Sequence, residues 1–357
     1  MSGRIRVLVV DDSALICRMV SEILSQDPAI EVVGTASNGR VALSRIDELR
    51  PAILTLDVEM PEMNGLETLR LLRKEHRNLP VVMLSTHTER GAAITLDCLY
   101  LGADDYVTKP TAVGPDGLAP LAQELLSKIK LHAMPPPRFE PASLSAVARA
   151  PRFAPPPGRT ARVQVLVIGS STGGPNALTE LLCALTPRFP LPVLVVQHMP
   201  PLFTKTLADR LASQSGLDVR EAVNGGTLAP RAAWVAPGDY HLEVMPARAG
   251  LSLVVHQGPH ENSCRPSVDV LFRSAAYAYG PGVLAVVLTG MGRDGLSGCR
   301  RIRETGGRIL VQDAPSSVVW GMPGCVAEAG LAEAVLPPRE IGFEVSRRVR
   351  ESGVAWS

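Results

Sequence analysis

The chain has 357 residues, of which 46% are hydrophobic and 20% are charged, and its formal net charge is +1. This length exceeds what one hydrophobic core usually organises, so we expect two domains. Charge is balanced in both halves, with 14 basic and 18 acidic residues over 1–130 and 17 and 16 over 163–357, which excludes a basic nucleic-acid-binding module. No apolar run nears the roughly 18 residues of a membrane span and no signal peptide is recognisable, so we expect a cytoplasmic protein without membrane insertion.

Residues 1–130 alternate short apolar runs with stretches of helical periodicity. The apolar runs cover 7–10, 53–56, 81–84 and 105–107. Continuous apolar runs between amphipathic helices are typical of parallel strands buried on both faces. We therefore predict a doubly wound α/β domain.

Charged and hydroxyl side chains follow these strands. Asp11 and Asp12 come after the first run, Asp57 after the second, Ser85 after the third and Lys109 after the last. The carboxyl ends of parallel strands share one edge of the sheet, so these side chains should converge at the topological switch point. Carboxylates suit magnesium, and Asp57 is placed to attack a phosphoryl group while the hydroxyl and the ammonium bind its oxygens.

The motifs VVDDS, TLDVEMPEMNG, MLST and DDYVTKP make this part similar to the receiver domains of two-component response regulators. The resemblance implies a flavodoxin-like fold with Asp57 as phospho-acceptor and Asp11 and Asp12 as further Mg²⁺ ligands. It also implies that Ser85 and Lys109 bind the phosphoryl group. Tyr106, on the last strand, would be the aromatic switch residue.

Residues 131–162 contain two Pro-Pro-Pro runs and no sustained apolar period. Such a segment cannot bury a core, so we predict a semi-extended linker between domains at 1–130 and 163–357. Its basic excess leaves open whether it also binds a partner.

The C-terminal part predicts a second doubly wound sheet. Its continuous apolar runs cover 163–168, 193–196, 283–288 and 309–311. Three further runs, at 232–235, 240–245 and 251–255, are separated by turn residues and suggest an antiparallel appendage.

A serine, a histidine and an aspartate follow three of these strands. Gly169 to Gly173 reads G-x-S-x-G, which places Ser171 on a nucleophile elbow. His198 follows the run at 193–196, and Asp294 lies beyond the run at 283–288. The fold can bring the three together as nucleophile, base and orienting acid, with His260 as the alternative base.

Glycines surround Met291 in the stretch TGMGRDG. Because glycine permits close backbone approach, the Met291 amide is a candidate oxyanion-hole donor. The six cysteines stand singly, without the spacing of a zinc site or a disulfide framework. We therefore expect reduced thiols and no cofactor for the hydrolytic reaction.

The motifs GSSTGG, QHMPPLFTKTLADRL, APGDYHLEV, RPSVDVLF, LTGMGRDG and VVWGMP resemble the CheB methylesterase domain, over about 163–337. The resemblance implies a Rossmann-like domain in which Ser171, His198 and Asp294 form the triad and Met291 supplies an oxyanion-hole amide. Two positions depart from the family pattern: Cys264 stands where members often carry histidine, and Arg293 fills a variable position.

The combined resemblance implies a phosphorylation-activated esterase that demethylates glutamate methyl esters on methyl-accepting chemotaxis receptors. Deamidation of receptor glutamines is the same acyl transfer with ammonia leaving. A CheA-type histidine kinase would be the phosphodonor, and the unphosphorylated receiver would cover the esterase cleft. Three other functions remain to be tested: a phosphorylatable adaptor without turnover, a DNA-binding output and a general small-molecule esterase.

Overall fold

The computed structural model describes residues 4–110, 115–133, 161–186, 188–247 and 250–354. The chain divides into two compact units, 1–141 and 142–357. Within the described ranges, no helix combines the length and apolar character needed to cross a bilayer.

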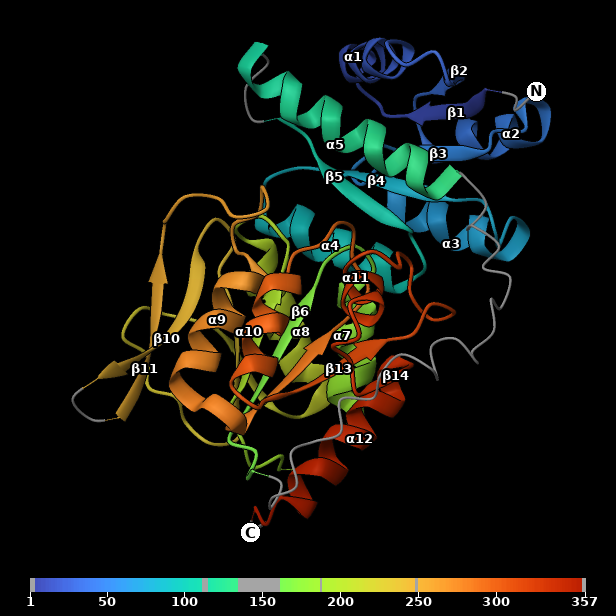
Figure 1. The fold of residues 1–357 in the computed structure, drawn as a ribbon. Coiled ribbons are helices and arrows are strands. Elements are labelled where there is room, and N and C mark those ends of the chain that lie inside the picture. The colour runs from blue at the N-terminus through green and yellow to red at the C-terminus, as the bar shows by residue number, and fades with distance from the viewer. Residues whose placement is uncertain (1–3, 111–114, 134–160, 187, 248–249, 355–357) are drawn as a thin grey trace. The chain divides into compact units, whose positions relative to one another are not determined.

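The first unit alternates strands and helices along the chain (Figure 1). Its elements are β1 (Ile5–Val10), α1 (Ala14–Ser25), β2 (Ile30–Ala36), α2 (Gly39–Leu49), β3 (Ile53–Asp57), α3 (Gly65–Glu75), β4 (Val81–Ser85), α4 (Glu89–Tyr100), β5 (Asp105–Thr108) and α5 (Pro115–Ala133). The sheet order is β2-β1-β3-β4-β5, with parallel pairing throughout. This is the flavodoxin-like order, whose switch point lies between β1 and β3, and the predicted fold class is confirmed.

Local signals explain where the helices of this unit begin. Ser13 caps α1 by accepting a hydrogen bond from the Ile16 amide, and Asn64 and Glu67 form a reciprocal capping box at the start of α3. Helices α1 and α5 pack together, as do α2 with α3 and α3 with α4. The central strands are buried on both faces, as their continuous apolar sequences predict.

The second unit is built on a larger sheet, with order β14-β13-β12-β6-β7-β9-β8 and parallel pairing throughout. Its strands are β6 (Val165–Ser170), β7 (Val193–Gln197), β8 (Asp218–Glu221), β9 (Ala232–Val235), β12 (Val283–Val287), β13 (Arg308–Gln312) and β14 (Ala334–Leu336). Its helices are α7 (Gly174–Ala184), α8 (Phe203–Ser215), α9 (Val268–Tyr279), α10 (Leu296–Glu304), α11 (Met322–Glu328) and α12 (Pro338–Glu351), with a 3₁₀ turn at Gly280–Gly282.

The antiparallel appendage is smaller than the sequence suggested. Strands β10 (His241–Ala247) and β11 (Gly250–His256) form a two-stranded antiparallel sheet, as predicted. Strand β9 was wrongly assigned to it, because β9 pairs in parallel with β7 and β8 in the main sheet. A four-residue apolar run fits a hairpin or a buried parallel strand equally well, so local sequence could not decide.

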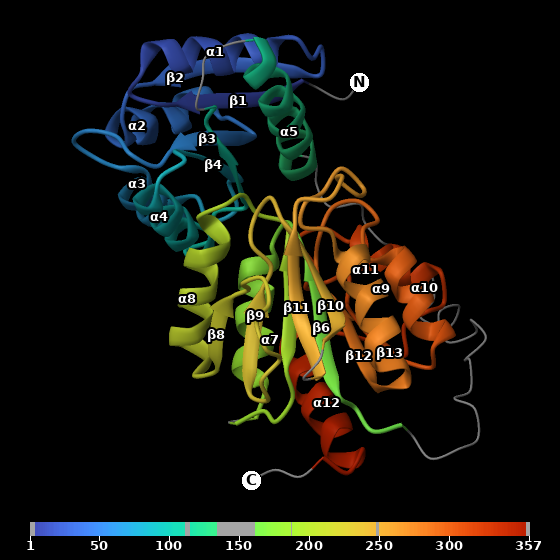
Figure 2. The same cartoon turned by 90° about the vertical axis from the view of Figure 1, so that its left-hand side faces the viewer.

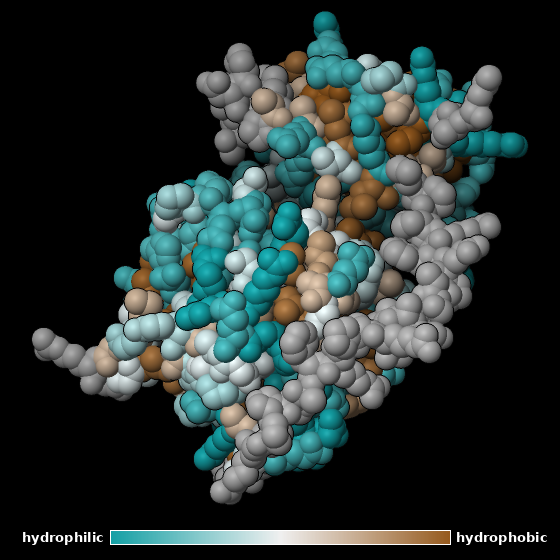
Figure 3. All heavy atoms as spheres, in the orientation of Figure 1, coloured by the Kyte–Doolittle hydropathy of each residue, from teal (hydrophilic) through white to brown (hydrophobic). Residues whose placement is uncertain are grey.

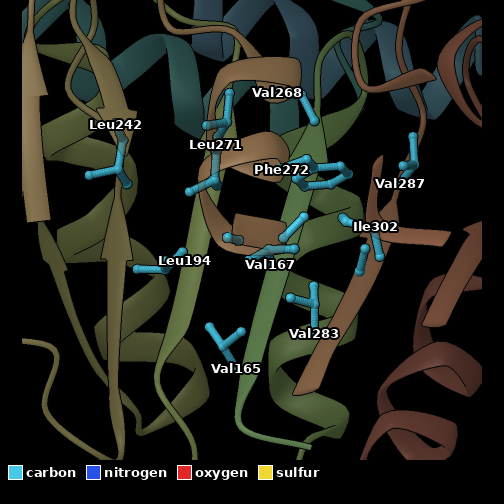
Figure 4. Packing of buried hydrophobic residues seen from close by; sticks show 14 of the residues in the cluster. Val165, Val167, Leu194, Leu242, Val268, Leu271, Phe272, Val283, Val287 and Ile302 are labelled. Carbon is cyan, nitrogen blue, oxygen red and sulfur yellow. The ribbon is translucent and has the colours of Figure 1, made fainter. Parts of the chain in front are cut away.

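The core of the second unit lies between the sheet and α9. Figure 4 shows Val268, Leu271 and Phe272 of α9 directed at the apolar side chains of the neighbouring strands, including Val167. Helix α9 also packs on α10, while α7 packs against α8 and α12, so the helices form two layers (Figure 2). The outer positions of α10 are exposed, and Figure 3 shows hydrophilic side chains over that helix.

The predicted linker can be located only by its ends. Helix α5 ends at Ala133, three residues beyond the boundary expected at 130, and β6 begins at Val165. Both Pro-Pro-Pro runs lie within 134–160, outside the described residues. The linker therefore stays a prediction.

Candidate functional site

The first cluster lies at the carboxyl ends of β1, β3 and β5. Asp11 follows β1, Asp57 ends β3 and Lys109 follows β5. Lys109 Nζ lies 2.7 Å from Asp11 Oδ2 and 2.8 Å from Asp57 Oδ1. The carboxylates of Asp11, Asp12 and Asp57 offer oxygens within 4.8 Å of one another. The structure thus brings together four of the predicted receiver residues.

Electrostatics distinguish Asp57 within this cluster. Burial raises the pKa of Asp57 to about 6, although the ammonium of Lys109 opposes the shift. The same contacts raise the pKa of Lys109 against the opposing effect of its own burial. Three carboxylates facing one ammonium leave an excess of negative charge, and hard oxygen donors are the ligands that magnesium prefers. The donor set therefore fits Mg²⁺.

Ser85 and Tyr106 lie near this edge of the sheet. The β3–β4 register pairs Asp57 with Leu84, so Ser85 is the next residue along its strand. The Ser85 hydroxyl is buried and accepts a hydrogen bond from the Thr95 hydroxyl at 2.7 Å. Tyr106 is buried on β5, with 7% of its surface exposed. The roles of both residues toward a phosphoryl group stay predictions.

The second cluster lies at the carboxyl ends of β6, β7 and β12. Ser171 directly follows β6, His198 directly follows β7, and Asp294 lies on the loop between β12 and α10. His198 Nε2 lies 2.8 Å from Asp294 Oδ2, within hydrogen-bonding distance. The His198 amide donates to Ser170 O at 3.1 Å and the Ser171 amide to Thr289 O at 3.0 Å, so backbone bonds join the three loops.

Asp294 accepts an unusually large number of hydrogen bonds. Asn262 Nδ2 and Ser267 Oγ each donate to Oδ1 at 2.8 Å, and the Val268 amide donates to Oδ2 at 2.6 Å. That amide belongs to the first turn of α9, whose dipole favours a negative charge. Burial alone would raise the pKa of Asp294, but the bonds from His198 and these donors outweigh it and hold the pKa well below its usual value.

The other ring nitrogen of His198 faces a residue that sequence analysis noted only as a departure. Cys264 Sγ lies 3.7 Å from His198 Nδ1. Burial lowers the pKa of His198, but the bonds to Asp294 and Cys264 outweigh it and raise the pKa above its usual value. Among the interactions of the described residues, none joins the Ser171 hydroxyl to His198. The alternative base, His260, is exposed, and within the described ranges no hydrogen bond or ion pair joins it to this cluster.

Glycine and an amide side chain shape the turn that carries Ser171. A Cβ on Gly290 would lie 2.8 Å from Ser171 Cβ, so only glycine fits there without displacement. Gly173, the N-cap residue that precedes α7, has φ +77°, a conformation that favours glycine. Gln197 Nε2 donates to Ser171 O at 2.8 Å. In the described ranges the Met291 amide has no hydrogen-bond acceptor, which leaves it available to an oxyanion.

Three of these supporting residues were not predicted as part of the site: Gln197, Asn262 and Ser267. Their contacts join segments that are distant in sequence, such as Asn262 with Asp294. The only local signal is at Ser267, a residue type that often precedes a helix and here precedes α9. Polar residues that act on another side chain leave no pattern of their own.

Comparison with known proteins assigns both units. Residues 166–345 match the family model for the CheB methylesterase, and residues 7–115 match that for the response regulator receiver domain. A protein-glutamate methylesterase/protein-glutamine glutaminase of Nocardioides sp. is 53% identical over 97% of this chain and 95% of its own. One of the same name from Trichodesmium erythraeum is 45% identical over 97% and 99%. The crystal structure of the Thermotoga maritima CheB methylesterase catalytic domain covers 52% of this chain and 98% of its own, at 41% identity and a TM-score of 0.51.

Proposed function

This chain belongs to the CheB protein-glutamate methylesterase family, and from that premise we propose that Ser171, His198 and Asp294 hydrolyse glutamate γ-methyl esters on chemotaxis receptors. The observation that carries the proposal is the 2.8 Å contact of His198 Nε2 with Asp294, at the sheet edge where Ser171 also emerges. A histidine so oriented can accept the proton of a serine nucleophile.

The contacts of the His198 imidazole support a different role for each ring nitrogen. Asp294 occupies Nε2, so Nδ1 is the atom that takes the proton of Ser171. This exchanges the two ring nitrogens relative to the serine-protease arrangement, in which the acid binds Nδ1. In the reactive state, the serine hydroxyl replaces the thiol of Cys264 at Nδ1.

The reaction then proceeds in two halves. Ser171 Oγ bonds to the ester carbonyl carbon, its proton passes to His198 Nδ1, and the Met291 amide donates to the oxyanion. Collapse breaks the carbon–methoxy bond, and the proton on Nδ1 leaves with methanol. Water attacks the acyl-enzyme and gives a proton to His198 Nδ1. The bond between the acyl carbon and Ser171 Oγ then breaks, the proton on Nδ1 returns to Oγ, and the glutamate product leaves. A glutamine substrate follows the same path, with ammonia as the leaving group.

The receiver unit supplies regulation. Asp57 accepts the phosphoryl group from a CheA-type histidine kinase, and Lys109 and Ser85 bind the transferred oxygens. Asp11, Asp12 and Asp57 would hold Mg²⁺, which neutralises charge during the transfer when bound. Phosphorylation, with Tyr106 as the aromatic switch residue, shifts the population toward a state in which the esterase is active. These events take place in the cytoplasm.

Methanol release from methylated receptor tests both halves of the proposal. Ser171→Ala should reduce the rate by about 10⁶-fold, to near background, because no nucleophile remains. Ser170→Ala is the matched control, since it removes the neighbouring hydroxyl of the same turn, and it should lose far less. Asp57→Asn should keep basal release but lose its stimulation by a small phosphodonor with Mg²⁺.

Two results would overturn the proposal. Equal rates for Ser171→Ala and wild type would exclude this serine as the nucleophile. Receptor binding without any methanol release would favour the phosphorylatable adaptor instead.

A further inference from the structure

A histidine nitrogen and a cysteine sulfur face each other beside the proposed nucleophile. Cys264 Sγ lies 3.7 Å from His198 Nδ1, and its other recorded contact is with Asn262 O at 3.4 Å. The thiol is partly exposed, and the imidazole side chain is 14% exposed. Both side chains therefore keep some exposure to solvent.

We propose that this pair binds a soft divalent cation, with Zn²⁺ as the best match, and that the bound cation inhibits the esterase. Zinc takes thiolate sulfur at about 2.3 Å and imidazole nitrogen at about 2.0 Å, so a tetrahedral angle places the two ligand atoms about 3.5 Å apart. The observed separation of 3.7 Å nearly matches this value. Thiolate and imidazole are also the ligands that distinguish zinc from magnesium.

The surroundings of His198 fit a metal ligand. Its Nε2 lies 2.8 Å from Asp294 Oδ2, and the second nitrogen of a metal-binding histidine is usually held by a carboxylate in this way. This contact places the ring proton on Nε2 and leaves the Nδ1 lone pair for the cation. Asp294 itself belongs to the outer shell, because donors such as Ser267 and Val268 already occupy both of its oxygens.

A bound cation would inhibit the esterase because it would occupy the lone pair of His198 Nδ1. The nitrogen that would bind the cation is the one that accepts the proton of Ser171 in the proposed function, on which this consequence rests. Binding releases to solvent the thiol proton of Cys264 and any proton held on His198 Nδ1, and it leaves the remaining metal positions to water. With two protein ligands, the site should be reversible and emptied by a chelator.

The test uses the full chain and two metal probes. Cd²⁺ is titrated while the ultraviolet charge-transfer band of a cadmium–thiolate bond is followed, and Zn²⁺ is titrated in the methanol-release assay. Each rate is expressed relative to the same variant without metal. In the wild type, the charge-transfer band should saturate at one equivalent of Cd²⁺, and Zn²⁺ should lower the rate of methanol release at least tenfold. A chelator should reverse both changes.

Substitutions of the two proposed ligands test which side chains bind the metal. Cys264→Ala should abolish the saturable one-equivalent band and the zinc sensitivity, whereas Cys264→His should keep the zinc sensitivity and lose the band. His198→Ala should weaken cadmium binding, which tests that ligand without any activity. Cys183→Ser is the matched control, because this exposed thiol contacts Gln214 O instead, and it should retain both responses.

The outcomes separate this inference from the proposed function. A band that depends on Cys264 and His198 in a chain without esterase activity would support the metal site and reject the function. A zinc response unchanged in Cys264→Ala, or a wild type with neither band nor inhibition, would overturn the metal site and leave the function untouched.

Discussion

Two buried aspartates, one at the carboxyl edge of each main sheet, differ in their electrostatics. Asp57 and Asp294 are each 2% exposed, and each follows or ends a central parallel strand at the carboxyl edge of its sheet. Burial raises the pKa of Asp57 to about 6, whereas the pKa of Asp294 is held well below its usual value. Both carboxylates are buried at the carboxyl edge of a parallel sheet, so burial alone does not distinguish them and their immediate neighbours account for the difference.

The neighbours match the task proposed for each carboxylate. Among the described residues, Asp57 pairs with Lys109, which also pairs with Asp11, and this ion pair does not offset the effect of burial on the pKa of Asp57. Asp294 accepts bonds from His198, from two side chains and from the first turn of α9. The carboxylate that is proposed to react, Asp57, has few hydrogen-bond donors around its oxygens. The carboxylate that is proposed to orient the histidine, Asp294, accepts hydrogen bonds at both oxygens.

Among the substitutions that test this comparison of the two aspartates, the largest effect is expected from removing the charge of Asp294. Asp294→Asn should lower kcat by about 10⁴-fold, because the amide cannot hold His198 in the required tautomer. It should also destabilise the second unit, since an amide NH₂ would face donors such as Ser267 and Val268. Steady-state kinetics and denaturant unfolding measure the two effects.

Asp269→Asn is the control for that substitution. Asp269 is also buried and accepts hydrogen bonds from Asn262 and the Gly298 amide, but in the described part of the chain it makes no hydrogen bond to His198. It should therefore lose much less in kcat. Equal losses for the two variants would show that Asp294 acts by supporting the loops alone.

The second prediction concerns Asp57, whose carboxylate has few hydrogen-bond donors around it. A pKa raised from 3.8 to about 6 means that ionised Asp57 disfavours the folded receiver, by about 3 kcal/mol at pH 7. Asp57→Asn should therefore slow amide hydrogen exchange in β1 and β3 at pH 7, while it abolishes phosphorylation.

The pH dependence of this stabilisation by Asp57→Asn provides a control. The folded-state pKa is above the unfolded value, so the penalty is complete above the folded pKa and disappears as pH falls below 3.8. The advantage of Asp57→Asn over wild type should shrink along the same range. A variant less stable than wild type at pH 7 would contradict the difference drawn between the two aspartates.

The smallest expected effect is a difference in pH dependence. Phosphorylation of Asp57 needs the carboxylate, so its rate should fall as pH drops through about 6. This limb should move to lower pH as the Mg²⁺ concentration rises, because a cation favours the charged form. The rate of phosphorylation by a small phosphodonor, followed against pH at several Mg²⁺ concentrations, measures this shift. A pH dependence that does not change with the Mg²⁺ concentration would argue against Asp57 as a ligand of the cation.

The esterase rate should also fall toward acid pH, but the group that titrates there is His198 rather than Asp57. His198 must be neutral to accept a proton, and its raised pKa places this limb above the ordinary histidine range. Cys264→Ala should move the limb to lower pH, because one of the contacts that raise the pKa is removed. Ionisation of Asp294 should leave no limb in the working range, since its pKa is lowered.

The sequence by itself determined the two α/β units and the residues that leave their strand ends. Continuous apolar runs followed by Asp57, Ser171 or His198 indicate buried parallel strands with reactive groups at one edge, because parallel strands place all their carboxyl ends together. These signals are local, so they can be read along the chain. The relatives support the same family assignment.

Tertiary structure alone decided what each site residue touches. The placement of β9 in the main sheet, the donors around Asp294 and the approach of Cys264 to His198 all join segments distant in sequence. Single cysteines without zinc-like spacing gave no sign of the last contact. Hydrogen bonds and ligand pairs depend on distances between side chains, and folding sets those distances across the chain rather than along it.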